Sequence, residues 1–193
     1  MQSLFVCISN QLKAFINPNH VFLNVEISTD RLLLKPISML YKSDIFVEFT
    51  DEVTTYMYPR PAQDIFETES FINDSILGMK KEHHLIFVIL KKDSQDFLGC
   101  AGIHKINTNH PELGIWLKKS AHGNGYGLET ITELKNWAES NLKYRYLVYP
   151  VDQENIPSRK IPERLGGTIA REYNKTNLSG KVLHIVEYKI SKA

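Results

Sequence analysis

Three glycines stand at every second position of residues 122–127, in the run His-Gly-Asn-Gly-Tyr-Gly. An apolar strand pattern over residues 113–117 precedes this run, and a helical pattern begins directly after it. The first N–H groups of a helix have no partner within the helix, and the helix dipole makes that end positive. Because glycines leave those N–H groups uncovered, the run predicts an anion site for a phosphate.

Two familiar phosphate loops do not fit this run. The dinucleotide-binding fingerprint G-x-G-x-x-G needs glycine or alanine at position 128, which is Leu128. The P-loop needs Gly-Lys followed by Ser or Thr, which the chain lacks. On the motif alone, a phosphate loop and an ordinary glycine-rich strand-to-helix turn stay equally open.

Composition narrows the class of protein. The 193 residues are 42% hydrophobic and 23% charged, which predicts one globular domain with a sizeable core. With 23 basic and 22 acidic residues, no overall basic excess indicates nucleic acid as a partner. No stretch approaches the roughly 20 apolar residues of a membrane span, and the N-terminus lacks the basic start of a signal peptide. Cys7 and Cys100 make no disulfide framework, which favours reduced thiols in a cytoplasmic protein.

The first residues form a separate pattern. Apolar side chains recur there at helical spacing, at Leu4, Phe5, Ile8, Leu12, Phe15 and Ile16. We expect an amphipathic helix over residues 1–17, in an N-terminal extension over 1–27 that precedes the main domain at 28–193. Its apolar face predicts packing against that domain or against a second copy in a homodimer. A membrane surface fits less well, because Lys13 is the only basic residue of this helix.

The remaining chain carries both strand and helix patterns. Strands are expected over residues 26–36, 84–91, 97–104, 112–117, 144–151, 168–173 and 183–190. Helices are expected over residues 43–50, 64–80, about 128–142 and 155–165. The aromatic, proline-broken stretch 56–61 is expected to be a loop. This order predicts a single α+β domain with one mixed sheet of about seven strands flanked by helices.

Three motifs occur in order and at compatible spacing. Residues 29–34 read Thr-Asp-Arg-Leu-Leu-Leu, residues 113–117 lead into the loop 122–127, and residues 155–160 read Asn-Ile-Pro-Ser-Arg-Lys. Together they resemble the opening strand, the fourth strand with its pyrophosphate loop, and the Asn-x-x-Ser helix of one protein family. That family is the GNAT superfamily of acyl-CoA N-acyltransferases, and the most similar branch is the ribosomal-protein-alanine N-acetyltransferase-like branch.

The resemblance covers about residues 28–190 and implies a fold and a reaction. The fold is a mostly antiparallel sheet that splays between its fourth and fifth strands. In the reaction, a neutral primary amine attacks the thioester carbonyl of acetyl-CoA, a tetrahedral oxyanion forms, and CoA thiolate leaves. The acceptor is a protein N-terminus or a small amine. No metal takes part.

The resemblance also assigns the cofactor-binding residues. The backbone N–H groups of the loop are expected to bind the CoA diphosphate, at His122, Gly123, Asn124, Gly125, Tyr126 and Gly127. A backbone N–H around Ile115, Trp116 and Leu117 is expected to bind the thioester oxygen, and the same strand edge to pair with pantetheine. Asn155 is expected to hold the pantetheine arm, to cap its helix, or to do both.

Two residues are the catalytic candidates. Ser158, carried over from the Asn-x-x-Ser match, is expected to serve the leaving thiolate, although a plain serine in the first helical turn fits equally well. Glu112, at the start of its strand, is the candidate general base, and an exposed strand-edge glutamate is the equal alternative. The histidines near the hairpins, among them His104, lack the acidic or thiol partners of a metal site.

The chain departs from the family pattern in three places. His122 replaces the usual Gln or Arg, Gly167 replaces Phe, and Pro162 falls where many members carry the tyrosine that protonates the thiolate. The missing tyrosine and the two prolines of the last expected helix, Pro157 and Pro162, support an alternative, a catalytically weak GNAT-like module that binds acyl-CoA as a sensor or partner. A nucleotide-binding protein unrelated to acyl transfer is a third hypothesis, which rests on the glycine loop alone.

Overall fold

The structure is a computed structural model that describes residues 22–192, and the helix expected over residues 1–17 lies outside them. In this range eight strands form one sheet, in the order β1-β2-β3-β4-β5-β6-β8-β7. The strands are β1 (Ile27–Ser28), β2 (Leu32–Pro36), β3 (His84–Lys91), β4 (Phe97–His104), β5 (Glu112–Leu117), β6 (Tyr146–Asp152), β7 (Thr168–Thr176) and β8 (Val182–Ser191). Neighbouring strands are antiparallel, except for β5 and β6, which are parallel.

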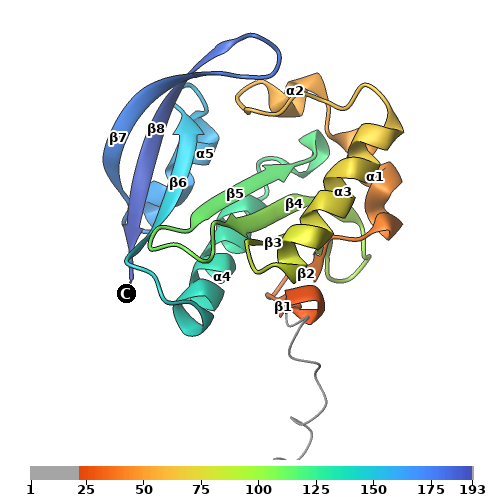
Figure 1. Cartoon of the computed structure of the whole chain (residues 1–193), viewed down its shortest axis with the longest axis horizontal. Coiled ribbons are helices and arrows are strands. Elements are labelled where there is room, and N and C mark those ends of the chain that lie inside the picture. The colour runs from red at the N-terminus through yellow and green to blue at the C-terminus, as the bar shows by residue number, and fades with distance from the viewer. Residues whose placement is uncertain (1–21, 193) are drawn as a thin grey trace, which may run out of the picture.

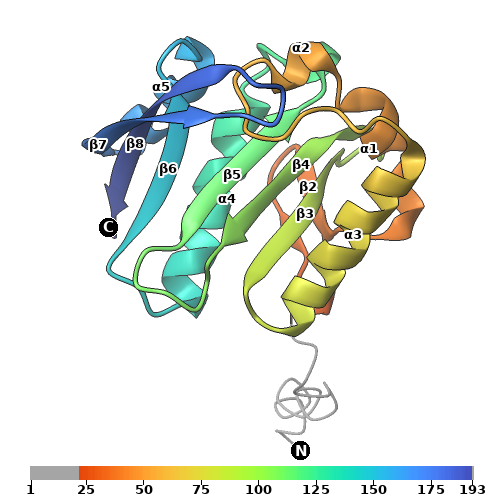
Figure 2. The same ribbon diagram turned by 45° about the horizontal axis from the view of Figure 1, so that its top comes forward.

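Helices lie on both faces of this sheet, which confirms the expected α+β class (Figure 1). They are α1 (Lys42–Glu48), α2 (Asp51–Thr54), α3 (Ile65–Lys80), α4 (Tyr126–Asn141) and α5 (Ile156–Arg164), with the 3₁₀ turns η2 (Met39–Tyr41) and η3 (Lys119–Ala121). Helices α1 and α3 lie on one face, over strands β2 to β4, and α4 lies on the opposite face (Figures 1 and 2). Among residues 22–192, no helix is long and apolar enough to cross a membrane.

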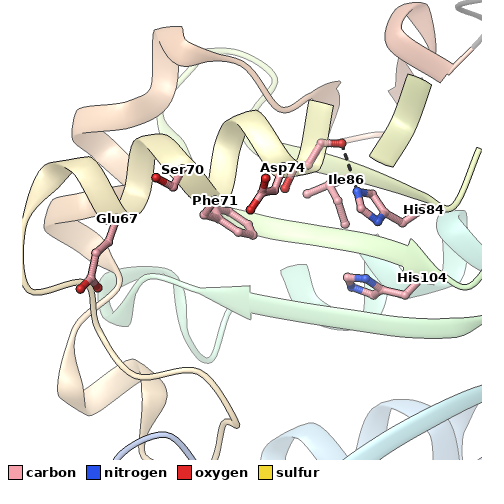
Figure 3. Close-up of a pocket in the computed structure, with 8 residues that line it drawn as sticks. Glu67, Ser70, Phe71, Asp74, His84, Ile86 and His104 are labelled. Atoms are coloured by element: carbon pink, nitrogen blue, oxygen red, sulfur yellow. Dashed lines mark hydrogen bonds between the residues drawn. The ribbon is translucent and has the colours of Figure 1, made fainter. Parts of the chain in front are cut away.

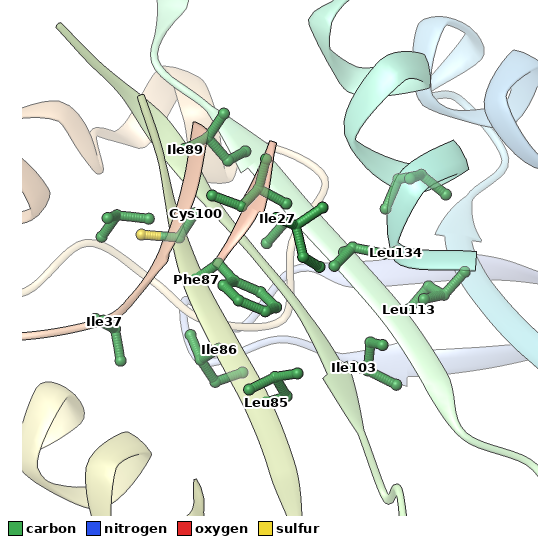
Figure 4. Close-up of a cluster of buried hydrophobic side chains, with 14 of the residues drawn as sticks. Ile27, Ile37, Leu85, Ile86, Phe87, Ile89, Cys100, Ile103, Leu113 and Leu134 are labelled. Carbon is green, nitrogen blue, oxygen red and sulfur yellow. The ribbon is translucent and has the colours of Figure 1, made fainter. Parts of the chain in front are cut away.

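The core forms where the sheet is covered on both faces. Strand β3 has six consecutive buried residues, 85–90, because it lies inside the sheet, where α3 packs on it directly and α4 covers the opposite face at β4 and β5. Figure 4 shows this cluster, in which Phe87, Ile103 and Leu113 come from three adjacent strands and Leu134 from α4. Cys100 is a buried free thiol in the same cluster, and burial raises its pKa far above the usual value for a thiol.

Two elements differ from the sequence-based expectation. The strand expected over residues 26–36 is two strands, because the backbone turns at Thr29, whose N–H donates to Leu32 O at 2.9 Å. This turn raises the strand number from about seven to eight. The helix expected over residues 43–50 ends at Glu48, and Thr50 caps the separate turn α2 by accepting from the N–H of Val53. Both differences arise from threonines whose side chains compete for backbone hydrogen bonds.

Gly99 marks a β-bulge that the alternation of the sequence does not reveal. Its φ is +153°, and a Cβ there would collide with the carbonyl oxygen of Trp116. The register between β3 and β4 shifts beside it, between Ile89 and Leu90. Glycine at this position therefore allows β4 to bend and still keep its pairing with β5.

We predict that Gly99→Ala lowers the free energy of unfolding by about 2 kcal/mol or more, because it combines backbone strain with a collision against backbone. The control is Gly114→Ala in the adjacent strand, where φ is not positive and the nearest atom to a Cβ is His104 Nε2 at 3.4 Å. That control should change stability by less than about 1 kcal/mol. Urea unfolding measures both, and equal effects would contradict the assignment of the bulge.

Candidate functional site

The sheet opens between its two parallel strands. Strands β5 and β6 share one registered pair, Glu112 with Val148, next to a hydrogen bond from Val148 N to Pro111 O of 2.8 Å. Beyond this pair the two strands diverge, as Figures 1 and 2 show. Residues 114–117 of β5 are only half-buried as a result. The expected splay between the fourth and fifth strands of the domain core, β5 and β6 here, is therefore present, and it leaves β5 with an open edge beyond Glu112.

The pairing with β4 decides which N–H groups of β5 point to this open edge. Lys118 N donates to Leu98 O at 2.8 Å, and the register stays constant along both strands. Leu98 and Lys118 thus form a hydrogen-bonded pair. Because hydrogen-bonded and non-hydrogen-bonded pairs alternate in an antiparallel ladder, the next hydrogen-bonded pair is Cys100 with Trp116. The N–H groups of Ile115 and Leu117 then point away from β4, toward the open edge of β5. Ile115, Trp116 and Leu117 were all expected to offer a donor for the thioester oxygen. The register favours the N–H groups of Ile115 and Leu117 for this role.

The two faces of β5 have different surroundings. The Trp116 ring lies 4.9 Å from the Phe49 ring, at the end of α1, so this face meets α1 and α3. Leu117 lies on the α4 side, 3.8 Å from where a Cβ of Gly127 would be. Alternation places Glu112 with Trp116 on the α1 and α3 face.

The glycine loop leads from β5 into α4. Residues 122–125 are exposed. Gly123 and Gly125 have φ angles of +77° and +78°, and Gly125 is the N-cap of α4. A Cβ at Gly123 would meet no atom within 4 Å, so this glycine serves the backbone conformation and leaves open space above it. Gly127 serves packing instead, since a Cβ there would lie 3.2 Å from Ile161 Cδ1 of α5.

Polar side chains of the loop turn back onto its own carbonyl groups. The His122 ring nitrogen Nε2 is 2.9 Å from Leu117 O. Asn124 Nδ2 donates to His122 O at 2.9 Å and to Ala121 O at 3.2 Å. His122 N donates to Lys119 O at 3.1 Å, so this expected donor is already used. Because these carbonyl oxygens are occupied, the loop offers the N–H groups from Gly123 onward. That arrangement suits an anion, which carbonyl oxygens would repel.

Arg31 fixes this loop from a distant part of the chain. Its Nη1 donates to Asn124 O at 3.1 Å, its Nε donates to Glu129 Oε2 at 2.8 Å, and its guanidinium lies 4.7 Å from the centre of the Tyr126 ring. Burial alone would raise the pKa of Glu129, but hydrogen bonds from Thr29 and Arg31 hold that pKa below its usual value. The sequence placed Arg31 in the opening motif but gave no sign of these contacts.

Asn155 and Ser158 lie together where α5 begins beside β6. Asn155 Oδ1 accepts from Ser158 N at 3.3 Å, so Asn155 caps the helix as expected. Both residues are half-buried. The Ser158 hydroxyl lies 2.9 Å from the hydroxyl of Tyr149 in β6, a partner that the sequence did not indicate. Pro162 lies inside α5, and its carbonyl accepts from Gly167 N at 2.8 Å.

Glu112 lines a cavity of about 490 Å³ together with Lys105, Tyr146 and Arg171, and it does not line the groove on the α3 face. Its carboxylate pairs with Lys105 Nζ at 2.8 Å, and its cross-strand neighbour is His104. Burial lowers the pKa of His104 and keeps its imidazole neutral near pH 7. The groove, about 500 Å³ in volume, lies between α3 and the strands, and Phe71 and Asp74 line it together with His104 (Figure 3).

The aromatic loop expected on the acceptor side crosses toward the hairpin of β7 and β8. Leu178 N donates to Tyr58 O at 3.0 Å, and Asn177 Nδ2 donates to Met57 O at 3.3 Å. Lys175 Nζ lies 3.7 Å from the centre of the Tyr58 ring. Figure 2 shows the hairpin tip and this loop meeting at one end of the sheet. No group of three or more side chains suited to a metal ion occurs among residues 22–192.

A splayed pair of parallel strands, with a bare N–H loop at the end of one of them, defines the class of acyl-CoA-dependent transferases. Comparison with known families gives the particular one. Residues 31–168 match the model of the acetyltransferase (GNAT) domain, so the chain belongs to the GNAT acetyltransferase family. This confirms the resemblance drawn from the three motifs, and it makes the chain an acetyltransferase with acetyl-CoA as its co-substrate.

Individual proteins agree with the family match. The chain is 25% identical over 174 residues to the uncharacterized N-acetyltransferase p20 of Bacillus licheniformis, which covers 85% of this chain and 94% of that protein. Its fold matches RimL, the ribosomal L7/L12 alpha-N-protein acetyltransferase, with a TM-score of 0.76 and 15% identity over 87% of this chain and 94% of that one. It also matches spermidine N-acetyltransferase from Vibrio cholerae in complex with CoA and spermine. The TM-score is 0.74 and the sequence identity is 16%, and the match covers 84% of this chain and 96% of that one.

We predict that Arg31→Ala weakens CoA binding about tenfold, because the loop loses the bonds that fix its conformation before the ligand arrives. Isothermal titration measures the dissociation constant. The control is Arg60→Ala, which removes a comparable ion pair, with Glu67, on the acceptor side and should leave CoA binding unchanged. CoA binding as tight in Arg31→Ala as in the wild type would contradict the role given to Arg31.

Proposed function

We propose that this protein transfers the acetyl group of acetyl-CoA directly to the primary amine of a small molecule or of a protein N-terminus. One observation carries the proposal: the loop exposed over residues 122–125 leads from the strand that splays from its parallel neighbour into α4, and the N–H groups of residues 123–126 have no partner among residues 22–192. Diphosphate and thioester can then be bound by one continuous segment of backbone.

CoA would lie along the edge of β5. The N–H groups of the loop and of the first turn of α4 bind the diphosphate, where the helix dipole adds positive potential. Pantetheine amides pair with the open edge of β5, in the manner of an added strand. The N–H of Ile115 or Leu117 then donates to the thioester oxygen and stabilises the oxyanion of the tetrahedral intermediate.

Two side chains would act on the amine proton and on the departing thiolate. As the new N–C bond forms and the C–S bond breaks, the amine nitrogen must lose a proton and the sulfur gains an electron pair. Glu112 accepts the proton from the amine, directly or through water. The Ser158 hydroxyl donates a hydrogen bond to the sulfur and stabilises the departing thiolate.

The acceptor would approach from the α3 face of the sheet, opposite α4. There the groove offers an apolar ring, Phe71, a carboxylate, Asp74, and the neutral imidazole of His104, whose cross-strand neighbour is Glu112. An aromatic ring and a carboxylate suit a protonated amine. Small amines and protein N-termini both carry this group, and the two structural neighbours described above are a spermidine N-acetyltransferase and an alpha-N-protein acetyltransferase.

Thiol release from acetyl-CoA tests the proposal. The purified chain is incubated with acetyl-CoA and a panel of polyamines, aminoalkyl compounds and short peptides with free N-termini. The proposal expects acceptor-dependent release of CoA and an acetylated amine in the mass spectrum. CoA binding without release across the whole panel would contradict it and would favour the acyl-CoA-binding module.

We predict that Gly123→Asp weakens CoA binding at least tenfold relative to Gly123→Asn, because only the aspartate places a negative charge next to the diphosphate. The two variants have the same shape, and both residue types tolerate a positive φ. Pantetheine, which lacks the diphosphate, should bind equally to both variants. Equal CoA affinity of the two variants would contradict the assignment of the diphosphate site to this loop.

We also predict that Glu112→Gln lowers kcat by about tenfold to a hundredfold and leaves KM for acetyl-CoA nearly unchanged, since the amide no longer accepts a proton. The matched control is Lys105→Met, which breaks the same ion pair but keeps the carboxylate. That variant should keep kcat within about threefold of the wild type. A similar loss in both variants would show that the ion pair matters and that the carboxylate is not the base.

A further inference from the structure

The hydroxyl of Ser158 has a second hydroxyl group against it. Tyr149 OH lies 2.9 Å from Ser158 Oγ. The tyrosine comes from β6 and the serine from the first turn of α5, so the contact joins α5 to the strand that diverges from β5. The family tyrosine expected in α5 is replaced by Pro162, which has no hydroxyl, and the structure places a different tyrosine beside the serine instead.

The direction of this hydrogen bond follows from burial. Tyr149 is only 2% exposed, and burial raises its pKa to about 12, so the phenol keeps its hydrogen near neutral pH. An undonated hydroxyl hydrogen is costly inside a protein. Among residues 22–192, Ser158 Oγ is the hydrogen-bonding partner that the structure gives to this hydroxyl. Tyr149 therefore donates and Ser158 accepts.

This direction leaves the hydrogen of the serine free. A serine hydroxyl has one hydrogen to donate and two lone pairs that accept. Tyr149 occupies one lone pair, so the serine hydrogen must point elsewhere. Ser158 is half-buried, and its own N–H is already bonded to Asn155. Ile161, one turn further along the same face of α5, lies next to Gly127 at the start of α4, so this face is turned toward the end of the glycine loop. The oriented hydroxyl can thus meet a group that enters between β5 and β6.

We propose that Tyr149 is a positioning residue for acetyl transfer: by donating to Ser158 Oγ, it directs the serine hydrogen toward the sulfur of the departing CoA. The proposal rests on the function given above. As the C–S bond breaks, the sulfur keeps the electron pair and accepts the serine hydrogen bond, while Tyr149 keeps its own proton throughout. A chain of two hydrogen bonds polarises the serine and strengthens its bond to the thiolate.

Tyr188 provides a matched control in the same structure. It is also 2% exposed, and it joins strand β8 to α5 through a 2.6 Å hydrogen bond to Glu163 and a 3.2 Å bond from Arg159. It has no hydrogen bond to Ser158. A phenylalanine at either position removes one buried hydroxyl that holds α5, but only the change at Tyr149 removes the donor to the serine.

The experiment measures the thiol pKa of bound CoA from the ultraviolet absorbance of its thiolate, in a pH titration of the protein–CoA complex. We expect Ser158→Ala and Tyr149→Phe each to raise that pKa, by about one unit for the serine variant. Adding Tyr149→Phe to Ser158→Ala should change it no further, and Tyr188→Phe should leave it at the wild-type value. Replacement of Tyr149 by 3-fluorotyrosine, a more acidic phenol of nearly the same shape, should lower it.

Each contrary result has a distinct meaning. If CoA binds the wild type and its thiol pKa is the same in Tyr149→Phe, the proposal is wrong. It is also wrong if Tyr149→Phe acts equally in the Ser158→Ala background, since the tyrosine then does not act through the serine. Should Tyr149→Phe fail to fold, an unchanged pKa with 3-fluorotyrosine overturns the proposal. Failure of the wild type to bind CoA would instead overturn the proposed function itself.

Discussion

The site depends on the parallel pairing of β5 and β6, which begins at Glu112 and Val148 and then stops. If that pairing continued, the N–H groups of Ile115 and Leu117 would be satisfied within the sheet and no ligand could use them. Because it stops, one strand keeps an open polar edge in the middle of a folded domain, which is costly unless a ligand or water pairs with it. The glycine loop lies at the end of that edge.

Preorganisation of this loop comes partly from outside it. Arg31 lies 93 residues before Asn124 in the chain, yet it binds the carbonyl of that residue. Within the loop, the side chains of His122 and Asn124 bind the carbonyl oxygens of Leu117 and His122. A glycine loop alone would sample many conformations and would lose that freedom on binding. Fixed in advance, it can bind an anion at a smaller entropic cost. The glycines make close approach possible, and the contacts of Arg31 make the conformation specific.

The sequence predicted the fold and the position of the loop well, because both depend on local pattern. Alternating glycines, the apolar run of β3 and the Asn155 cap are visible within a few neighbouring residues. What it missed depends on contacts that only folding creates: Arg31 against the loop, and Tyr149 against Ser158. The break between β1 and β2 was missed for a different reason, since a threonine hydroxyl there competes with the ladder within an otherwise apolar stretch. The roles assigned to Glu112 and Ser158 stay predictions.

The central claim is that the main-chain amides of residues 123–127 bind the diphosphate of CoA. The most direct measurement is a pair of NMR titrations of the ¹⁵N-labelled protein, one with CoA and one with pantetheine, which has no diphosphate. The account predicts that the amide signals of Gly123, Gly125 and Gly127 shift with CoA and stay in place with pantetheine, while those of Ile115 and Leu117 shift with both. Loop amides that respond equally to the two ligands, or to neither while CoA binds, would contradict it.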